Sequence, residues 1–360
     1  DLTNLVNLTR LQLNNNKITD LKIDAPASNF SSFSSPTYYF NISNNPFISC
    51  VEVPLLEVVN WDSRYAQVPQ IADNGIAFSD NCTGFRVPQT EREALIAFYI
   101  ATKGGEKVDA TLGITWFGTN WSTDATELTN VGSWQGVTTE IINGQKHVTK
   151  IELGSKQLSG EVPKEIADLP ELTRLDLSGG TISSIATEIG SLSKLTYLNF
   201  YGNSIESLPA GIGDFTSLLE LNLSRQRENI NTNHYIATLT SLPNEIGNIA
   251  TLEKLDLSYN GFTSLPSGIG NFTNLKELNL SYQSTSPVRY QTQPTLTSLP
   301  DEIGNITSLE KLYLQNNVLT SIPNTINGLT NLLEFRLEGN ELTSLPTTIG
   351  GLTSLEKFYL

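Results

Sequence analysis

Residues 299–344 read LPDEIGNITSLEKLYLQNNVLTS and then IPNTINGLTNLLEFRLEGNELTS, two segments of 23 residues that align without a gap. The leucine that anchors this pattern recurs at Leu172, Leu195, Leu218, Leu252, Leu275, Leu309, Leu332 and Leu355. Most steps between these leucines are 23 residues, and the two steps of 34 residues are repeats that carry an insertion of 11 residues. A fixed period of this length is typical of a solenoid, in which each repeat forms one coil.

Each repeat predicts one strand, one turn and one short helical segment. Side chains alternate along a strand, so the aliphatic residues should point inward and the residue between them outward. Prolines such as Pro300 stand where the helical turn should begin, and glycines such as Gly304 stand where it should stop. An asparagine follows the strand at Asn203, Asn260, Asn317 and Asn340 and should bond the backbone of the adjacent turn, whereas Lys156, Gly180, Gln226 and Gln283 replace it in other repeats. Nine strands are predicted, centred near Glu152, Asp176, Asn199, Asn222, Asp256, Asn279, Tyr313, Arg336 and Tyr359.

The repeats divide the chain into four predicted segments. Residues 1–49 hold the end of a first repeat array, because the sequence pattern that starts at Leu11 recurs at Phe40. Residues 50–82 lack the pattern and are expected to cap that array. Residues 83–147 form a linker and the N-terminal cap of a second array, with an amphipathic helix that starts at the capping box Thr90–Glu93. Residues 148–360 form the second array, with insertions near 225–237 and 282–295. The tryptophans of the third segment either plug the start of the next core or form an aromatic ligand cage, and we favour the plug; they are Trp116, Trp121 and Trp134.

Composition excludes several function classes. The net charge of −15 repels phosphate backbones, so nucleic acid is not an expected partner. No apolar run is long enough to span a membrane. The chain begins and stops inside a repeat, so we expect it to be part of a longer protein. With two histidines and no motif for a nucleophile, a phosphate loop or a zinc site, we expect no enzyme activity, no cofactor and no metal.

Two cysteines occur, Cys50 and Cys82. They either form a disulfide or remain two buried thiols. We expect the disulfide, because both residues stand where the first array ends. A disulfide would place the protein in an oxidising, extracellular compartment.

The text LPxxIGxLTxLxxLxLxxNxLTS, which covers residues 172–360, resembles the leucine-rich repeat proteins of the secreted or cell-surface kind. EREALIAFY, SWQGV and LSGEVPKEI resemble the N-terminal cap and first repeat of plant-type extracellular members and their bacterial relatives. NNPFISC and FSDNC are similar to the end cap of bacterial surface members. The resemblance implies an α/β solenoid shaped like a horseshoe, with a parallel sheet on its concave side. It also implies a protein that binds other macromolecules and is not a catalyst.

The two insertions are the first candidate binding region. Both should leave the same edge of the sheet, two strands or about 10 Å apart, and project from the rim of the concave face. Loops that interrupt a regular scaffold often carry binding residues, although long surface loops are also tolerated without any function. The cations and aromatics that we expect to bind a partner there are Arg225, Arg227, His234, Tyr235, Tyr282, Arg289 and Tyr290.

The concave sheet is the second candidate binding region. Its outward positions are mostly charged, and the most informative exposed groups are Tyr197, Tyr201, Tyr313 and Arg336. We therefore expect a non-catalytic extracellular module for recognition or adhesion that binds a protein or a glycan through the sheet and the two insertions. The alternatives are a structural spacer or adhesin stalk without a specific site, and the sensor part of a larger receptor-type enzyme.

Overall fold

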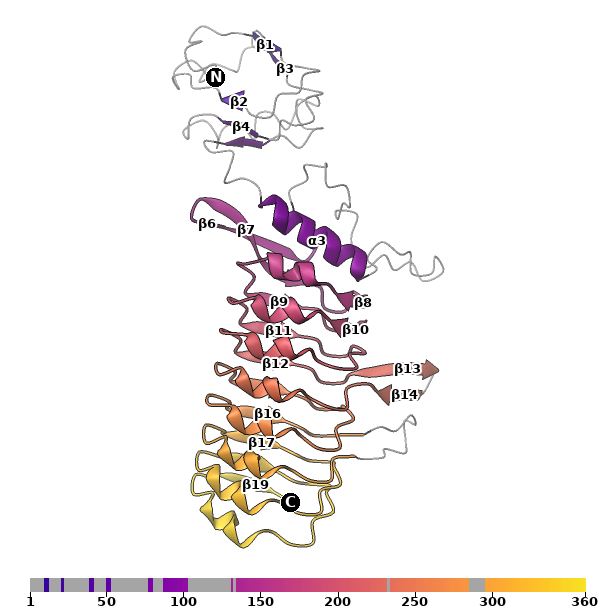
Figure 1. Ribbon diagram of the computed structural model, residues 1–360, viewed down its shortest axis with the longest axis vertical. Coiled ribbons are helices and arrows are strands. Elements are labelled where there is room, and N and C mark those ends of the chain that lie inside the picture. Colours follow the sequence, from indigo (N-terminus) through magenta and orange to yellow (C-terminus); the bar gives the residue numbers. More distant parts are fainter. Residues whose placement is uncertain are drawn as a thin grey trace. The chain divides into compact units, whose positions relative to one another are not determined.

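The computed structural model describes residues 87–102, 131, 134–231, 234–284 and 295–360, together with the backbone of five short strands before residue 80 (Figure 1). Within the hairpin near residue 232, the side chains of residues 229–231 and 234 lie outside this description. The described residues belong to two compact units. One draws on residues 1–92, 124–134 and 139–147, and the other on residues 93–123, 135–138 and 148–360.

In the first unit, short parallel strands pair at the predicted repeat spacing. Strand β1 (Arg10–Gln12) pairs with β3 (Tyr39–Asn41), and Leu11 lies opposite Phe40 as the sequence alignment predicts. Strands β2 (Leu21–Lys22), β4 (Cys50–Glu52) and β5 (Ala77–Ser79) form a second parallel sheet in the order β2-β4-β5. The side chain of Cys50 and all of Cys82 lie outside the described residues, so the disulfide stays a prediction.

The predicted helix is present as α3 (Gln89–Ala101). It begins one residue before the expected capping box, and its apolar side chains Ala94, Leu95 and Phe98 are buried. Trp134 is also buried, with the guanidinium of Arg92 5.7 Å from the centre of its ring, while Trp116 and Trp121 lie outside the described residues. No helix among the described residues is long and apolar enough to cross a membrane.

All nine predicted strands form one sheet, and the hairpin strand β6 adds a tenth at its edge, in the order β19-β18-β17-β16-β15-β12-β11-β9-β7-β6. The leucines that each strand directs inward lie in register, as Leu198, Leu221, Leu255 and Leu278 show. These leucines are almost completely buried, so each coil shares its apolar layer with the next one. The strands are β6 (Val137–Ile142), β7 (Gln145–Glu152), β9 (Arg174–Asp176), β11 (Tyr197–Asn199), β12 (Glu220–Asn222), β15 (Lys254–Asp256), β16 (Glu277–Asn279), β17 (Lys311–Tyr313), β18 (Glu334–Arg336) and β19 (Lys357–Tyr359).

Short 3-10 helices stack in one row along the array (Figure 1). A proline precedes all but one of them in extended conformation, as predicted, and Ala186 precedes the exception, η5. On the flank between the sheet and this row, β8 (Ser159–Val162) and β10 (Thr181–Ile185) form a short parallel pair. The 3-10 helices are η4 (Lys164–Asp168), η5 (Thr187–Ser191), η6 (Ala210–Asp214), η7 (Asn244–Asn248), η8 (Ser267–Asn271), η9 (Asp301–Asn305), η10 (Asn324–Gly328) and η11 (Thr347–Gly351).

The glycines of the repeat do not stop these helices, contrary to the sequence prediction. Gly247 and Gly304 are the fourth residues of their five-residue helices and do not have the left-handed conformation of a helix stop. They are required by close packing, because a Cβ at Gly247 would lie 1.8 Å from the carbonyl oxygen of Gly268 in the next coil. Glycine here sets the spacing between coils.

A ladder of buried amides joins the coils. The amide nitrogen of Asn260 donates to the carbonyl oxygens of Leu223 and Leu257, each at 2.9 Å, and its oxygen accepts from the backbone N–H of Gln226 at 2.8 Å. Gln226 and Gln283, which depart from the repeat pattern, perform the same task with a longer side chain, and both are completely buried. The ladder is therefore unbroken where the insertions begin.

Candidate functional site

The residue just before the ladder position of a coil has a left-handed backbone, both where a buried amide follows and where Gly180 takes the place of the amide. Its φ is 73° at Gly179, 68° at Gly202, 59° at Asn316 and 70° at Gly339, residue types that tolerate this conformation. The same position holds Arg225 (φ 62°), Tyr259 (φ 57°) and Tyr282 (φ 59°) on three successive coils. A bulky side chain in this conformation costs free energy, and such outliers concentrate at functional sites.

These three residues and Tyr201 form a continuous exposed surface, which we name the rim strip. Nη1 of Arg225 donates to the hydroxyl of Tyr201 at 2.8 Å. The rings of Tyr259 and Tyr282 stack with their centres 4.5 Å apart and their planes 4° from parallel. The exposed fraction is 38% for Tyr201, 50% for Tyr259 and 37% for Tyr282. Three phenol rings and one guanidinium therefore face solvent from four consecutive coils.

The electrostatics of the rim strip couple its hydroxyl groups. Partial burial raises the pKa of Tyr259, and the neighbouring hydroxyl of Tyr282 raises it further. The guanidinium of Arg225 opposes this rise in the pKa. The rim strip thus offers phenol O–H and guanidinium N–H groups as hydrogen-bond donors to a ligand.

Both insertions leave the array beside the rim strip. The first begins at Arg227, whose N–H donates to Asn203, and the chain returns at Thr238, whose N–H donates to Gln226. The second begins and returns through equivalent bonds, from Ser284 to Asn260 and from Thr295 to Gln283. The coil of Tyr259 lies between the two coils that carry them.

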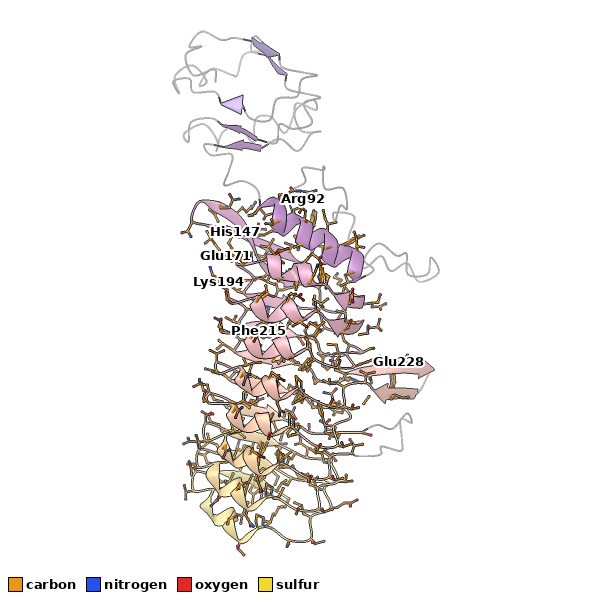
Figure 2. All side chains as sticks on the ribbon, in the orientation of Figure 1. Arg92, His147, Glu171, Lys194, Phe215 and Glu228 are labelled. Atoms are coloured by element: carbon orange, nitrogen blue, oxygen red, sulfur yellow. The ribbon has the colours of Figure 1, made fainter. Side chains whose placement is uncertain are left out.

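The first insertion is an antiparallel hairpin of β13 (Arg227–Asn231) and β14 (His234–Ala237). It extends from the flank where β8 and β10 lie (Figure 1). The sequence predicted a start at the rim of the sheet, but the chain first turns inward at buried Gln226 and only then leaves the array. Glu228 lies on the hairpin, away from the coils (Figure 2). The guanidinium of Arg227 lies 4.0 Å from the ring centre of Tyr235, whereas the side chain of His234 and all of Arg289 and Tyr290 lie outside the described residues.

Several charged side chains on the open face of the sheet pair with one another across the strands. Glu277 pairs with Lys254 at 3.4 Å and with Lys311 at 3.3 Å, so one carboxylate bridges two strands. Arg174 pairs with Glu152 at 2.9 Å and lies 3.5 Å from the ring centre of Tyr197. The Lys194–Glu171 pair at the 3-10 end of the strands repeats this arrangement (Figure 2).

The last coils carry the second aromatic group on the sheet. Arg336 lies 5.8 Å from the ring centre of Tyr313 and 4.6 Å from that of Tyr359, and its Nε donates to Glu334 at 2.8 Å. This hydrogen bond lowers the pKa of Glu334, and Lys357 at 3.5 Å contributes to the shift. Burial raises the pKa of Tyr313, with Glu334 and Glu277 adding to it. These side chains are held by one another more than those of the rim strip.

The structure thus divides the predicted site residues into three groups. Arg225, Tyr201 and Tyr282 join in the rim strip, Arg227 and Tyr235 pair in the hairpin, and the others with described side chains lie on the sheet. Tyr259 was missed by the sequence analysis. Alignment of LSRQ (223–226), LSYN (257–260) and LSYQ (280–283) with the glycine-bearing coils would have found it.

The described residues do not suggest a catalytic centre. No group of three His, Cys, Asp or Glu side chains among them could hold a metal ion. What the arrangement provides is a large surface with aromatic and cationic contact groups, which suits non-covalent recognition.

Comparison with known proteins agrees with this architecture. A leucine-rich repeat family model matches residues 170–227 and 307–360, and a second leucine-rich repeat model matches residues 251–272. No curated protein sequence matches the chain. The repeats are leucine-rich repeats, and the second array is a leucine-rich repeat solenoid.

Three solved structures are similar to the chain. A leucine-rich repeat protein of Leptospira interrogans is 34% identical with a TM-score of 0.48, over 56% of this chain and 47% of that one. The ectodomain of the Arabidopsis thaliana membrane receptor kinase GASSHO1/SCHENGEN3, in complex with CASPARIAN STRIP INTEGRITY FACTOR 2, is 22% identical with a TM-score of 0.50, over 75% of this chain and 33% of that one. The plant peptide hormone receptor RGFR1 in complex with RGF2 is 26% identical with a TM-score of 0.42, over 63% and 41%. The matches span between a third and half of these relatives' length, and the fold agrees with that of the receptor kinase ectodomain.

Proposed function

We propose that this leucine-rich repeat protein is a non-catalytic extracellular recognition module that binds a partner protein. The partner would lie against the rim strip, the neighbouring open face of the sheet and the two insertions. Leucine-rich repeat domains typically mediate protein binding, and the similar GASSHO1/SCHENGEN3 ectodomain was solved in complex with CASPARIAN STRIP INTEGRITY FACTOR 2.

The rim strip is the observation that carries the proposal. Arg225, Tyr259 and Tyr282 keep a backbone conformation that glycine would adopt at lower cost, and the solenoid itself needs only the small residues found on other coils. Tyrosine and arginine are enriched among the residues that contribute most to binding at protein interfaces, because tyrosine supplies a large contact area with few rotatable bonds and arginine supplies several N–H donors. A purely structural spacer has no need of such side chains at strained, exposed positions.

The insertions supply the test, because the structure defines how to remove them. Excision of residues 227–237 joins Gln226 directly to Thr238, whose backbone groups are already hydrogen-bonded to each other, and restores the 23-residue step. We expect this variant to lose capture of the partner from the surface of the native cells in a cross-linking pull-down. We also expect thermal unfolding close to that of the wild type, since surface loops contribute little to stability.

The matched control is a replacement within the regular array. Glu341→Gln changes an exposed residue on a coil remote in sequence from the insertions, and it should leave both capture and unfolding unchanged. Equal capture by the wild type and by a variant that lacks residues 227–237 and carries Tyr259→Gly would contradict the proposal and favour the spacer.

A further inference from the structure

The donors and the spacing of the rim strip point to the chemistry of the partner. Coils follow one another at the strand spacing of about 4.8 Å, so aromatic residues two coils apart, such as Tyr201 and Tyr259, are about 9.6 Å apart along the array. A polyproline II helix rises about 3.1 Å per residue with three residues per turn, so it presents the same face about every 9.3 Å. The distance of about 9.6 Å between every second coil of the strip is therefore close to the polyproline II repeat of about 9.3 Å.

The hydrogen-bond donors of the rim strip also complement the acceptors of a proline-rich backbone. Arg225 offers only N–H donors, and the phenol groups beside it can donate through their O–H. A proline-rich backbone has the opposite character, because proline lacks an N–H and leaves its carbonyl oxygens without internal partners. Among the described residues of the strip, Arg225 donates one hydrogen bond, from Nη1 to the hydroxyl of Tyr201. The guanidinium has further N–H groups that can donate to a carbonyl oxygen.

The exposed rings provide the apolar contacts that such a segment needs. Tyr282 covers one face of the Tyr259 ring, yet half of Tyr259 stays exposed. Aromatic ridges with intervening donors are how proline-rich segments are recognised on other scaffolds, since the ligand is already ordered and little conformational entropy is lost. The carboxylate of Glu277 on the neighbouring sheet is already paired with Lys254 and Lys311, so the contact groups that the strip itself offers are its rings and its hydrogen-bond donors.

We propose that the rim strip of Tyr201, Arg225, Tyr259 and Tyr282 binds an extended proline-rich segment of the partner in the polyproline II conformation. This inference rests on the proposed function, because it identifies which part of a partner protein the module contacts. The segment runs along the array across the coils, with pyrrolidine rings against the tyrosines and carbonyl oxygens on Arg225 and the phenol hydroxyls.

The test measures the fluorescence anisotropy of labelled decaproline titrated with the whole chain. We expect saturable binding of decaproline and none of a glycine-serine peptide of equal length. Tyr259→Gly should weaken binding at least about tenfold, as the loss of a central contact residue does. The glycine suits a φ of 57°, so the variant should fold, and circular dichroism melting confirms this.

Two further variants distinguish the strip from its scaffold. Asn316→Gly changes the same left-handed position on a coil outside the strip and should keep the affinity within about twofold, as expected for a site without contact. Tyr201→Phe keeps the ring but removes the acceptor of Arg225, so it should alter affinity less than Tyr259→Gly does.

Three results would overturn the inference. They are failure of the wild type to bind decaproline, equal binding by folded Tyr259→Gly, and competition for the strip by an oligosaccharide such as cellohexaose, which would indicate a glycan. If decaproline does not bind but Tyr259→Gly still loses the natural partner in the pull-down, the proposed function stands and only the proline-rich ligand is refuted.

Discussion

The three coils at Arg225, Tyr259 and Tyr282 differ from the plain coils at Asn316 and Gly339 in the side chain at one position and not in the backbone conformation at that position. Both sets share the left-handed residue, the ladder amide that follows it and the parallel strand before it. In the plain coils this position holds the residue types that fit it best. In the other three it holds residues that the solenoid does not require.

This difference distinguishes the residues that the fold requires from the exposed residues that it does not require. The inward leucines, the amide ladder and the close-packed glycines recur regardless of the rim residues, so they are requirements of stacking. Bulky residues at a strained position that add nothing to the core are more simply explained by a contact outside the chain. The variants below test this separation, because they should affect either stability or binding and seldom both.

The largest effect is expected for the ladder that both sets of coils share. Asn260→Ala removes three hydrogen bonds and leaves two carbonyl oxygens and one N–H buried without these partners. Each unsatisfied group costs about 1–3 kcal/mol, so the free energy of unfolding should fall by about 3 kcal/mol or more. Urea unfolding measures this loss.

Asn331→Ala is the control for the ladder. Its side chain donates one exposed hydrogen bond to Thr307 of the preceding coil, so the loss should stay below about 1 kcal/mol. If the two variants were equally stable, the buried ladder would not be a principal support of the coils.

The next largest effect concerns the spacing of the coils. Gly247→Ala places a Cβ 1.8 Å from the carbonyl oxygen of Gly268, so the coils must move apart, at a cost of about 1–3 kcal/mol typical of overpacking. Gly350 has the same place in its repeat, but a Cβ there meets no atom within 4 Å. Gly350→Ala should therefore leave the melting temperature nearly unchanged, and an equal loss in both variants would contradict the packing explanation.

The sequence predicted most of the fold, because the solenoid is specified by a short period. The 23-residue step predicted all nine strands, the register of Leu198 with Leu221 and the prolines that precede the 3-10 helices. The role of Gly247 could not be derived from one repeat, because the oxygen that excludes a side chain belongs to the neighbouring coil. Likewise, Gln226 departs from the asparagine of the repeat, and only the structure shows that its longer side chain bonds the same kind of backbone groups.

The candidate site was predicted only in part. Arg225 and Tyr282 were found through their closeness to the insertions, whereas Tyr259 belongs to a coil of regular length and was passed over. Its importance depends on backbone conformation and on stacking across coils, which a linear reading does not display. Arg227 and Tyr235 were selected together, and the structure shows that they pair with each other in the hairpin.

A smaller effect should expose the strain in the rim strip. Tyr259→Ala and Tyr259→Gly both remove the stacked ring, but only glycine relieves the left-handed conformation. Tyr259→Gly should therefore be more stable than Tyr259→Ala by about 1 kcal/mol. Gly202→Ala, at the same left-handed position in the coil of Tyr201 and with no atom nearer than 3.8 Å to the new Cβ, should lose a similar amount. Unequal differences in thermal unfolding would mean that Tyr259 is not held in the same conformation as Gly202.

The smallest effect concerns the charges that hold the last coils together. Arg336 and Lys357 lower the pKa of Glu334 below its ordinary value of 4.5, so this carboxylate stabilises the fold above that pH. The stabilisation is lost as the pH falls through the lowered pKa, where the folded protein takes up the proton as well. The melting temperature of Glu334→Gln should therefore lie slightly below that of the wild type at pH 7 and approach it as the pH falls well below 4.5. The difference should also shrink in high salt, because these pairs are near the surface. Glu341→Gln, at an exposed residue for which no ion pair occurs within residues 295–360, should show no such convergence, and a parallel pH dependence of the two variants would refute the assigned role of Glu334.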